Sequence, residues 1–470
     1  SQYAFQRTAF RKLNLNILKS SYLKKSLYFP LPIEYLDTLS KNNIKFSKIR
    51  CVFLWFIYSF LCWGYGNLIL IKILIKSVVN LFKPNQDTDL YFFQIKRENL
   101  PFKSIYKNRQ SYDLISWFIN FYHKSKIKIN KISHDNNKLN DYHNEEKIIQ
   151  YKDPPYYFIK NFFDILKFFI TGIFLSLLSL LFLFLGKWQS GFLIGEIFKT
   201  NSFLLTKKEK LSKKYLFHFS ETFYRPIWTY FEKKFNIDII LYFYSTYDAP
   251  KDNINIKIDK AFEFGNISWS KILVWDEIQK NIIKKYVSKK IKNLDIQVVN
   301  PIWFRDKDFQ FKNIKFRVLI FDMEVQRNSI HFGFGEIAMY NNIDKDLTLK
   351  FIRDIINVFD DKNTEFVLKR KREIGNNAQT NYKNYISSLK KNHLFLEVDQ
   401  NISPQYLIEN SDVVITMPFT SANMYKGSNK IKNIYYDPTN YINKKDPASR
   451  DITVINGIDE LKDWKKNYIK

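Results

Sequence analysis

Two long uncharged apolar stretches constrain the fold of this chain more than any other feature. Residues 51–65 and 168–185 contain no Lys, Arg, Asp or Glu, although charged residues make up 26% of the chain. A run of roughly 18–20 apolar residues has the length of a transmembrane helix, and a core helix of a soluble protein is seldom apolar on all sides at this length. The sequence therefore predicts two membrane-contacting segments, at about residues 51–82 and 156–200.

The flanking charges leave open how these segments meet the membrane. Lys and Arg residues stand on both sides of each stretch, so the positive-inside rule assigns no orientation. Glycines such as Gly66 and Gly186 interrupt the stretches, which favours helical hairpins that dip into one leaflet and return, or helices that lie in the interface. Two simple spans are the alternative, and they would leave residues 86–160 on the far side of the membrane.

The charge of the chain predicts an anionic partner. The formal net charge is +28, and the first fifty residues hold ten Lys or Arg and two acidic residues, a net of 10 − 2 = +8. Tyr22, Phe29 and Leu31 lie among these charges, as in helices that rest on an anionic bilayer; a solvated lysine-rich face is the alternative. No recognised nucleic-acid module accompanies the charge, so an anionic membrane surface and phosphorylated substrates are the expected partners, and nucleic acid is not.

Metal binding and disulfide bonds are not expected. Cys51 and Cys62 are the only cysteines, and both lie in the first apolar stretch, which leaves no disulfide framework and no cysteine-based metal site. Asp-x-Asp sequences occur at 306–308 and 344–346, but the first belongs to a charged linker and the second to the start of a helix. We therefore expect no metal cofactor.

The remainder of the chain alternates short apolar strands with amphipathic helices, a pattern typical of an α/β protein with mostly parallel sheets and helices on both faces. The pattern starts near residue 89, resumes after the second apolar stretch, and restarts after a linker near residue 301. We expect a basic N-terminal helical region (1–85), a Rossmann-like domain carrying the second membrane segment as an insertion (86–312), and a second Rossmann-like domain (313–470).

Two strand ends in the second domain carry residues that suit a phosphate. The apolar run at 413–416 is followed by Thr420, Ser421 and Asn423, which are common first residues of a helix, and a helix N-terminus binds anions through its free N–H groups. Another apolar strand is followed by four cations, Lys369, Arg370, Lys371 and Arg372. Parallel strands end at one edge of a sheet, so we expect these cations and hydroxyls to hold one phosphate. A capped turn and a solvated basic turn are the alternatives.

The motif formed by Pro418, Phe419, Thr420 and Ser421 resembles that of the bacterial polysaccharide-biosynthesis family named after its PFTS motif. Further stretches that match in the same order are residues 112–117, 224–230, 243–246, 274–277, 302–304, 321–327, 368–372 and 435–438. So many ordered matches exclude an accidental tetrapeptide.

The resemblance implies a glycosyltransferase with a GT-B-like fold, in which two doubly wound Rossmann-type domains face a cleft. It further implies an enzyme on the cytoplasmic face of the bacterial inner membrane that takes a sugar from a nucleotide-activated donor. The acceptor is expected to be a glycan or a lipid-linked glycan that becomes O-antigen, lipopolysaccharide or capsule. A non-catalytic membrane scaffold of a polysaccharide assembly complex is the competing function, and it would need no phosphate site.

The nucleotide of the donor stays open. GT-B enzymes that use CMP-activated acidic sugars commonly place a Lys/His-Pro element after one strand and a Ser/Thr pair after a later one. The basic run at 369–372 and the pair Thr420 and Ser421 occupy analogous places here, but no His-Pro is present. A CMP-sugar is thus one candidate donor, and a UDP- or GDP-sugar would need the same cations.

Sugar transfer also needs a group that takes the proton of the acceptor hydroxyl. Four carboxylates follow buried strands and are expected to include this base: Asp276, Glu277, Asp322 and Glu324. Arg327 is expected to add a cation to the donor site, and Pro418 belongs to that site through the motif. Cleavage of the sugar–phosphate bond leaves negative charge on the nucleotide, which such fixed cations and N–H groups stabilise.

Overall fold

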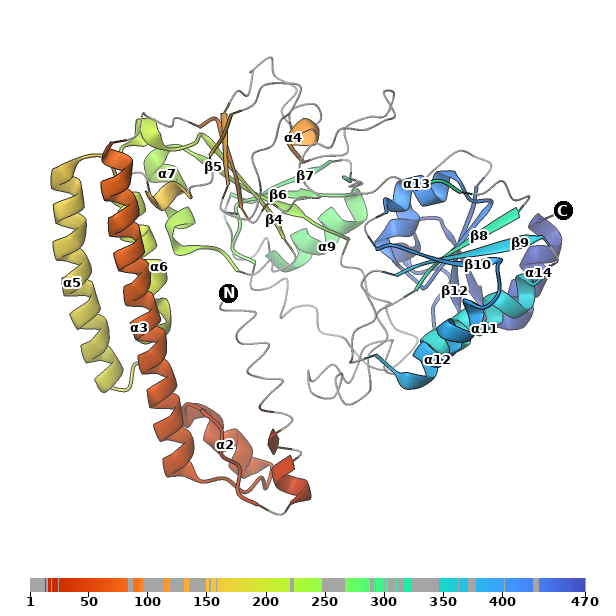
Figure 1. Ribbon diagram of the computed structural model, residues 1–470, viewed down its shortest axis with the longest axis horizontal. Helices are drawn as coiled ribbons and strands as arrows, with labels where there is room; N and C mark the ends of the chain where they lie inside the picture. Colours follow the sequence, from red (N-terminus) through yellow and green to blue (C-terminus); the bar gives the residue numbers. More distant parts are fainter. Residues whose placement is uncertain are drawn as a thin grey trace.

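The computed structural model contains two parallel β-sheets, a bundle of long helices and a small N-terminal unit (Figure 1). The structure describes residues 13, 16–17, 19–23, 25–82, 88–93, 95, 114–118, 131–134, 149–151, 154–157, 159–219, 224–246, 267–287, 291, 293–299, 301–302, 309–311, 316–322, 346–361, 363–370, 378–400, 402–425 and 431–469.

Seven parallel strands form the first sheet, in the order β3-β2-β1-β4-β5-β6-β7. Their bounds are β1 (Leu90–Phe93), β2 (Lys131–His134), β3 (Ile149–Tyr151), β4 (Lys214–Phe219), β5 (Asp238–Phe243), β6 (Lys271–Val274) and β7 (Asp295–Val298). One face packs against η5 (Ile227–Phe231), α7 (Glu232–Phe235) and α9 (Glu277–Val287), and the other against α4 (Leu114–Trp117).

Six parallel strands form the second sheet, in the order β10-β9-β8-β11-β12-β13. Their bounds are β8 (Phe316–Phe321), β9 (Thr364–Lys369), β10 (Phe395–Val398), β11 (Val413–Thr416), β12 (Lys432–Asp437) and β13 (Thr453–Asn456). The helices around it are α11 (Leu347–Phe359), α12 (Thr380–Leu389), α13 (Pro404–Glu409) and α14 (Ile458–Tyr468).

Strand β8 shows why these helices cover both faces of the second sheet. Val318 and Ile320 belong to the core cluster that contains α11, α12 and α14, whereas Leu319 and Phe321 belong to the cluster that contains α13. Successive side chains of a strand point to opposite faces, so an uninterrupted apolar run is the composition of a strand buried on both sides. The predicted α/β class with parallel sheets is confirmed.

The two predicted membrane segments form a bundle of three helices beside the first sheet. Helix α3 (Lys48–Leu81) packs against α5 (Phe162–Phe184) and α6 (Gln189–Leu205). The second segment is a helical hairpin, as expected, with Gly186 at a φ of 79° in its turn. The expectation of a hairpin in the first segment is wrong, because α3 runs through Gly66 as one helix of 34 residues. Among the described helices, α3 and α5 are long and apolar enough to cross a membrane, by length and composition alone.

The pairing of strands in the first sheet determines whether the segments before and after the α5–α6 hairpin lie on the same side of a membrane. Strands β1, β2 and β3 precede the α5–α6 hairpin and β4 follows it, and β1 pairs directly with both β2 and β4. A single hydrogen-bonded sheet cannot be divided by a bilayer. The described strands on either side of the hairpin therefore share one side of any membrane, which excludes the two-span alternative that would separate them.

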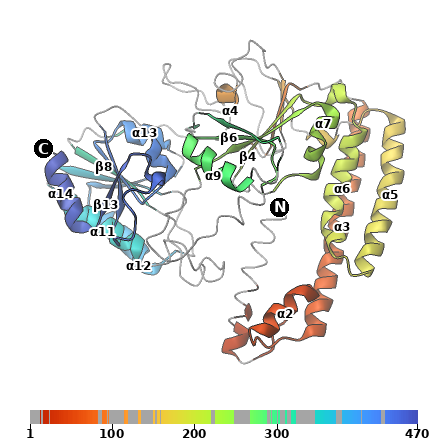
Figure 2. The ribbon, with the colours of Figure 1, turned by 180° about the vertical axis from the view of Figure 1, so that it is seen from behind.

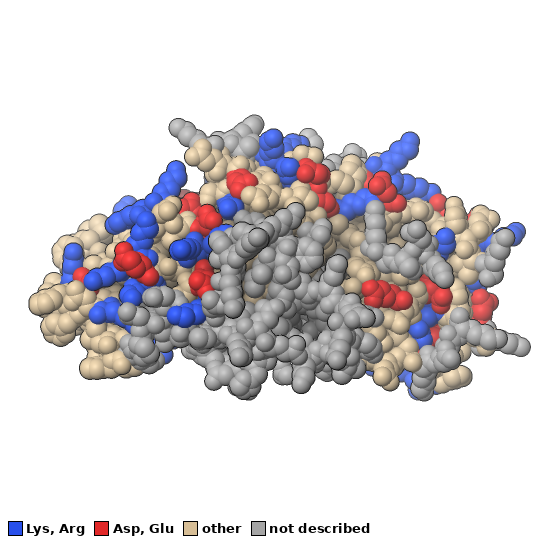
Figure 3. All heavy atoms as spheres, turned by 90° about the horizontal axis from the view of Figure 1, so that it is seen from above, with Lys and Arg blue, Asp and Glu red and all other residues tan. Residues whose placement is uncertain are grey.

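The small N-terminal unit lies at the far end of α3 from the first sheet (Figures 1 and 2). Helix α2 (Ile33–Lys41) contributes Leu36 and Leu39 to an apolar cluster with Leu27, Leu31 and Cys51. The Arg50 guanidinium lies 4.8 Å from the centre of the Tyr28 ring. Viewed from above, the described surface carries Lys and Arg interspersed with Asp and Glu (Figure 3).

Candidate functional site

The candidate site lies where the connections of the second sheet reverse direction. The chain runs outward from β8 to β9 and β10 on one side, and from β11 to β12 and β13 on the other. Such a reversal leaves a crevice at the carboxyl ends of the two central strands, where open α/β sheets bind ligands. Phe321 of β8 pairs with Thr416 of β11 and with Lys369 of β9. Adjacent strands lie about 4.8 Å apart, so the backbones of Thr416 and Lys369 lie roughly 10 Å apart.

Asp322 stands at this edge, directly after β8. Its side chain is buried, and the hydroxyl of Tyr382 from α12 donates a hydrogen bond to Oδ2. Burial raises the pKa of Asp322 to about 7, against the opposing effects of the Tyr382 hydrogen bond and of the charges of Arg370 and Lys369. Its Oδ1 atom is buried without a hydrogen-bond partner among the described residues, and so is Oγ1 of Thr416 on the neighbouring strand. This carboxyl group can change protonation near neutral pH.

The predicted cations begin at the same edge. Lys369 is buried at the end of β9 and donates from Nζ to the carbonyl of Gln400 at 2.7 Å. Burial lowers the pKa of Lys369 to about 8, while Asp399 and Asp322 act in the opposite direction. Arg370 forms an ion pair with Glu397. The prediction that this run is free to meet a ligand is wrong for Lys369 and Arg370, because Lys369 holds a protein carbonyl group and Arg370 a protein carboxylate.

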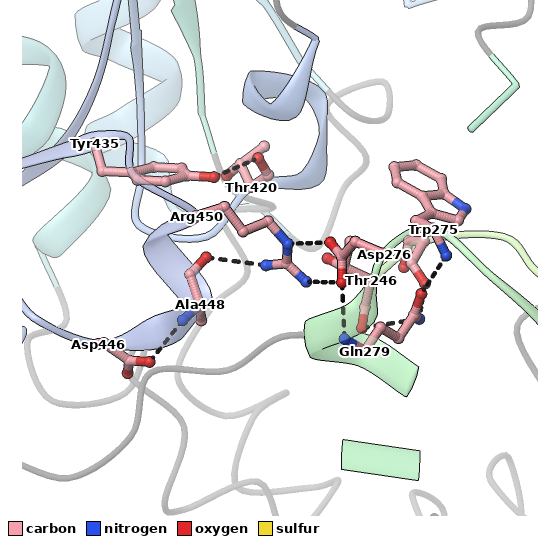
Figure 4. Close-up of polar contacts among 10 residues, drawn as sticks. Thr246, Trp275, Asp276, Gln279, Thr420, Tyr435, Asp446, Ala448 and Arg450 are labelled. Atoms are coloured by element: carbon pink, nitrogen blue, oxygen red, sulfur yellow. Dashed lines mark hydrogen bonds and ion pairs between the residues drawn. The ribbon is translucent and has the colours of Figure 1, made fainter. Parts of the chain in front are cut away.

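The PFTS segment follows β11, the neighbour of β8 on the side opposite β9. Phe419 has a φ of 63°, a left-handed conformation that non-glycine residues seldom adopt. Its ring packs edge-on against Tyr435, with ring centres 5.5 Å apart. The hydroxyl of Thr420 donates to the carbonyl of Met417 at 2.9 Å. The hydroxyl of Tyr435 donates to the carbonyl of Thr420 at 3.4 Å (Figure 4). Aromatic packing and a closed hydrogen-bonded turn hold the segment in this conformation.

The predicted helix after the PFTS segment is wrong within the described residues. Ser421 begins η7 (Ser421–Met424), a 3-10 helix of four residues, and the side chain of Thr420 makes no capping hydrogen bond. So short a turn offers no array of free N–H groups like that of an α-helix. Ser421 is partly exposed beside the switch point. An anion held here would therefore depend on side chains and single N–H groups.

Asp276, predicted as a candidate base, connects the two sheets. Its Oδ1 accepts a hydrogen bond from the N–H of Gln279 at 2.7 Å at the start of α9, and its carboxylate forms an ion pair with Arg450 (Figure 4). Arg450 follows η8 (Pro447–Ser449) and also donates to the carbonyl of Ala448 at 3.0 Å. Both carboxylate oxygens of Asp276 are thus engaged.

Gln279 extends this network into the first sheet. Its side chain accepts from the N–H of Trp275 at 2.9 Å and donates to the carbonyls of Ser245 and Thr246 at 2.9 and 3.2 Å. The ends of β5 and β6 are fastened together in this way. Glu277, the other candidate in this region, lies on the exposed surface of α9 and pairs with Lys280.

Met424 forms a second contact between the two sheets. It lies at the end of η7 and packs against the apolar cluster of the first sheet that includes Trp275 and Ile302. The PFTS segment therefore lies at the junction of the two α/β units. Arg450, Tyr382, Gln279 and Met424 were not identified from the sequence, because no local pattern shows that they meet residues distant in the chain.

A cleft of about 630 Å³ lies near this junction but not at the switch point. Its lining includes Ile278 of α9, the segment 449–454, and charged side chains such as Lys444 and Glu460. This cleft flanks β13, which is separated from β8 by β11 and β12. We place the candidate site at the switch point, because buried titratable groups converge there. Of the predicted site residues, Glu324, Arg327, Lys371 and Arg372 lie outside the described residues.

No group of three or more His, Cys, Asp or Glu suited to a metal ion occurs among the described residues. No curated protein sequence matches this chain.

One similar solved structure is described as giving "Insight into the mechanism of enzymatic glycosyltransfer with retention through the synthesis and analysis of bisubstrate glycomimetics of trehalose-6-phosphate synthase". It has a TM-score of 0.34 and 11% sequence identity, and the match covers 60% of this chain and 71% of that chain. Residues 169–465 match the family described as polysaccharide biosynthesis PFTS motif protein. The protein is therefore a member of the polysaccharide biosynthesis PFTS motif family.

Proposed function

We propose that this protein is a membrane-associated glycosyltransferase that transfers a sugar from a nucleotide-activated donor to a surface-polysaccharide acceptor. The observation that carries the proposal is the convergence of Asp322, Lys369 and the PFTS segment on one edge of the second sheet. Family membership in polysaccharide biosynthesis gives this edge its chemical context. The two α/β units would then act as a GT-B-like pair, with the donor at the switch point of the second unit.

The donor phosphate would be held by side chains from the ends of β9 and β11, the two strands that flank β8. Ser421 is a partly exposed hydroxyl of the PFTS motif after β11, and the positive charge of Lys369 lies at the end of β9. Hydrogen bonds from such groups to a phosphate strengthen as the sugar–phosphate bond breaks, because negative charge then gathers on the leaving nucleotide. CMP-, UDP- and GDP-sugars all carry the phosphate that this chemistry recognises.

Asp322 is the best placed of the predicted bases. Asp276 is engaged by Arg450 and Gln279, and Glu277 lies on an exposed helix surface, whereas Asp322 is buried at the switch point with an unpartnered oxygen among the described residues. A base is most effective when its pKa lies near the working pH, and the pKa of Asp322 is raised to about 7. In the proposed step its carboxylate takes the acceptor proton, the acceptor oxygen bonds to the anomeric carbon, and the nucleotide leaves with the bonding electron pair.

Nucleotide-sugar binding tests the donor site. We expect one of the CMP-, UDP- or GDP-sugars to raise the melting temperature of the detergent-solubilised protein. Ser421→Ala should weaken the affinity for that donor by roughly 10- to 100-fold, because a hydrogen bond to a charged group is worth about 1.5–3 kcal/mol. Ser387→Ala, on the exposed surface of α12, is the matched control. Equal affinities in the two variants would exclude the proposed donor site.

Transfer itself distinguishes an enzyme from a scaffold. Asp322→Asn should lower the rate of surface-glycan synthesis on the order of 10²–10⁴-fold while donor binding persists, because it removes the base and keeps the side-chain volume. Asp459→Asn, whose side chain is 89% exposed, should leave the rate unchanged. A scaffold would support normal glycan synthesis with Asp322→Asn and Ser421→Ala but not after deletion of the protein.

A further inference from the structure

The bundle of α3, α5 and α6 has large apolar side chains on its outside, and its inside combines an apolar cluster with small and polar residues. The outer surface includes Phe174 and Leu177 of α5 and Leu61 of α3, which are 64%, 61% and 62% exposed. At the helix contacts, by contrast, a side chain on Gly191 would come within 2.6 Å of the carbonyl oxygen of Ser59. A water-soluble bundle exposes polar side chains, whereas an apolar exterior with small residues at the helix contacts is typical of helices packed in lipid.

Several polar groups inside the bundle form hydrogen bonds with neighbouring helices. The indole N–H of Trp63 donates to the carbonyl of Ser176 at 3.1 Å, and the hydroxyl of Ser176 donates to Oδ1 of Asn67 at 2.6 Å. Asn201 of α6 donates to the hydroxyl of Thr171 of α5 at 2.7 Å. These bonds connect α3, α5 and α6 into one unit, so the bundle meets its surroundings as a whole.

The three helices lie at different distances from the first sheet. Helix α6 is adjacent to it: Ser202 donates to the carbonyl of Tyr156 at 2.6 Å, and Phe203 belongs to the core of the sheet. None of residues 190–205 is exposed, and the Glu196–Lys199 ion pair lies on this helix. Helix α5 lies on the opposite side of the bundle, away from both sheets (Figures 1 and 2). The bundle therefore offers an apolar surface on the α3 and α5 side only.

Helix length alone does not distinguish crossing a bilayer from lying along it. At 1.5 Å per residue, α3 with 34 residues and α5 with 23 residues are about 50 and 35 Å long, and a hydrocarbon core is about 30 Å thick. A bundle that crosses must present apolar side chains to lipid on every side. Here α6 packs against the first sheet near Ser202 and Phe203 and carries an ion pair, which favours lying along the membrane.

We propose that α3 and α5 lie along one leaflet of a lipid bilayer, with α5 deepest and α6 as the layer that joins them to the first sheet. Lys48, Arg50 and Lys187, at the ends of the bundle, would reach the anionic headgroups. The α2 unit also lies to the side of α3 that faces the sheets (Figures 1 and 2). The α2 unit, the turn of the hairpin and both sheets then share one side of the membrane.

Labelling of single cysteines tests this topology, and it needs no enzymatic activity. In a Cys51→Ser, Cys62→Ser background, Lys41→Cys, Lys187→Cys and Lys391→Cys place a thiol on the exposed α2 surface, the hairpin turn and the second sheet unit. All three should react with a membrane-impermeant maleimide from the same side of sealed vesicles. Protection of Lys41→Cys or Lys187→Cys while Lys391→Cys reacts would show a crossing bundle and overturn the proposal.

Vesicle flotation tests whether lipid covers the apolar surface. Phe174→Lys should weaken binding to vesicles of anionic phospholipid about 100-fold, because a charge in the hydrocarbon core is costly. Tyr468→Lys changes an aromatic residue that is 59% exposed on α14 and should leave binding unchanged. Flotation unaffected by Phe174→Lys, together with dissociation of a dimer in detergent, would assign the surface to a second copy of the chain instead.

This inference rests on the membrane association included in the proposed function, but the two can fail separately. Donor binding by Phe174→Lys, measured in detergent, should equal that of the unchanged protein. Loss of flotation with donor binding retained supports the membrane surface, whereas absence of donor binding in the unchanged protein rejects the transferase and leaves the topology result standing.

Discussion

Asp276 and Asp322 both follow a buried strand in the sequence, but their neighbours in the folded protein give them different roles. Each follows a buried parallel strand, and each was a candidate base on that ground. Asp276 begins a helix and pairs with Arg450, so its charge contributes to the junction of the two units. Asp322 is enclosed by Tyr382 and by the strand ends, where loss of solvent rather than an ion pair dominates its protonation.

Protonation of Asp322 makes the stability of the protein depend on pH. Its pKa rises from 3.8 to about 7 on folding, so the folded state binds this proton more tightly, and stability falls as the pH rises from 4 through 7. Asp322→Asn removes this dependence, so the melting temperature of the variant relative to the unchanged protein should increase across that range. Lys369, with its pKa lowered to about 8, changes protonation above this window.

Melting temperatures at pH 5 and pH 7.5 provide the measurement. Asp459→Asn is the control, since its carboxylate is 89% exposed and folding hardly changes its hydration. A difference between Asp322→Asn and the unchanged protein that stays constant over this range would show that folding does not raise the pKa of Asp322.

At the scale of single elements, glycine has two different roles in the bundle. Gly64 and Gly66 both lie within α3, yet a side chain on Gly64 would meet nothing within 4 Å, whereas one on Gly66 would meet Ile194 of α6. The sequence predicts an interruption of the helix at Gly66, but α3 continues through it. The close contact between α3 and α6 at Gly66 leaves no room for a side chain, which explains why a glycine is present there. The helix continues through Gly66 because tertiary packing outweighs the low helix propensity of glycine.

Substitution of Gly191 of α6 and of Gly64 of α3 by alanine tests the contact between these two helices. Gly191→Ala should destabilise the protein, because its added methyl group would lie 2.6 Å from the backbone oxygen of Ser59, and overpacking typically costs about 1–3 kcal/mol. Gly64→Ala should be neutral or stabilising by up to about 1 kcal/mol, since alanine favours the helix. Thermal unfolding in detergent gives both values. Equal destabilisation by the two changes would contradict the packing of α3 on α6.

At the scale of the whole molecule, the contacts of Arg450 and Met424 hold the two α/β units together. Arg450 forms an ion pair with Asp276 after the end of β6, and Met424 packs against the apolar cluster that includes Trp275. Met424 belongs to η7, which begins with Ser421 at the candidate donor site, whereas Arg450 lines the cleft beside β13. Binding at the switch point would therefore affect the contact between the units through Met424.

A double-mutant cycle measures the coupling across this junction. Arg450→Ala and Asp276→Asn should each lower the free energy of unfolding, and the double variant should lose less than the sum of the two. The expected coupling is about 1.5–3 kcal/mol, because the pair consists of charge-assisted hydrogen bonds and the Arg450 side chain is 9% exposed. Chemical denaturation of the four proteins in detergent provides the values. Additive losses would show that the pair does not contribute as one interaction.

The sequence by itself determined the α/β class, the apolar segments and the place of the PFTS motif at a strand end. These follow from periodicity and from the composition of strands buried on both faces, which are local properties. Contacts between distant residues decided the rest. They determine which carboxylate keeps an oxygen without a partner among the described residues, where the first apolar segment packs, and how the PFTS turn ends. Tyr382 meets Asp322 across 60 positions and Arg450 meets Asp276 across 174. The burial and pairing that set charge and conformation at these sites exist only after the chain has folded.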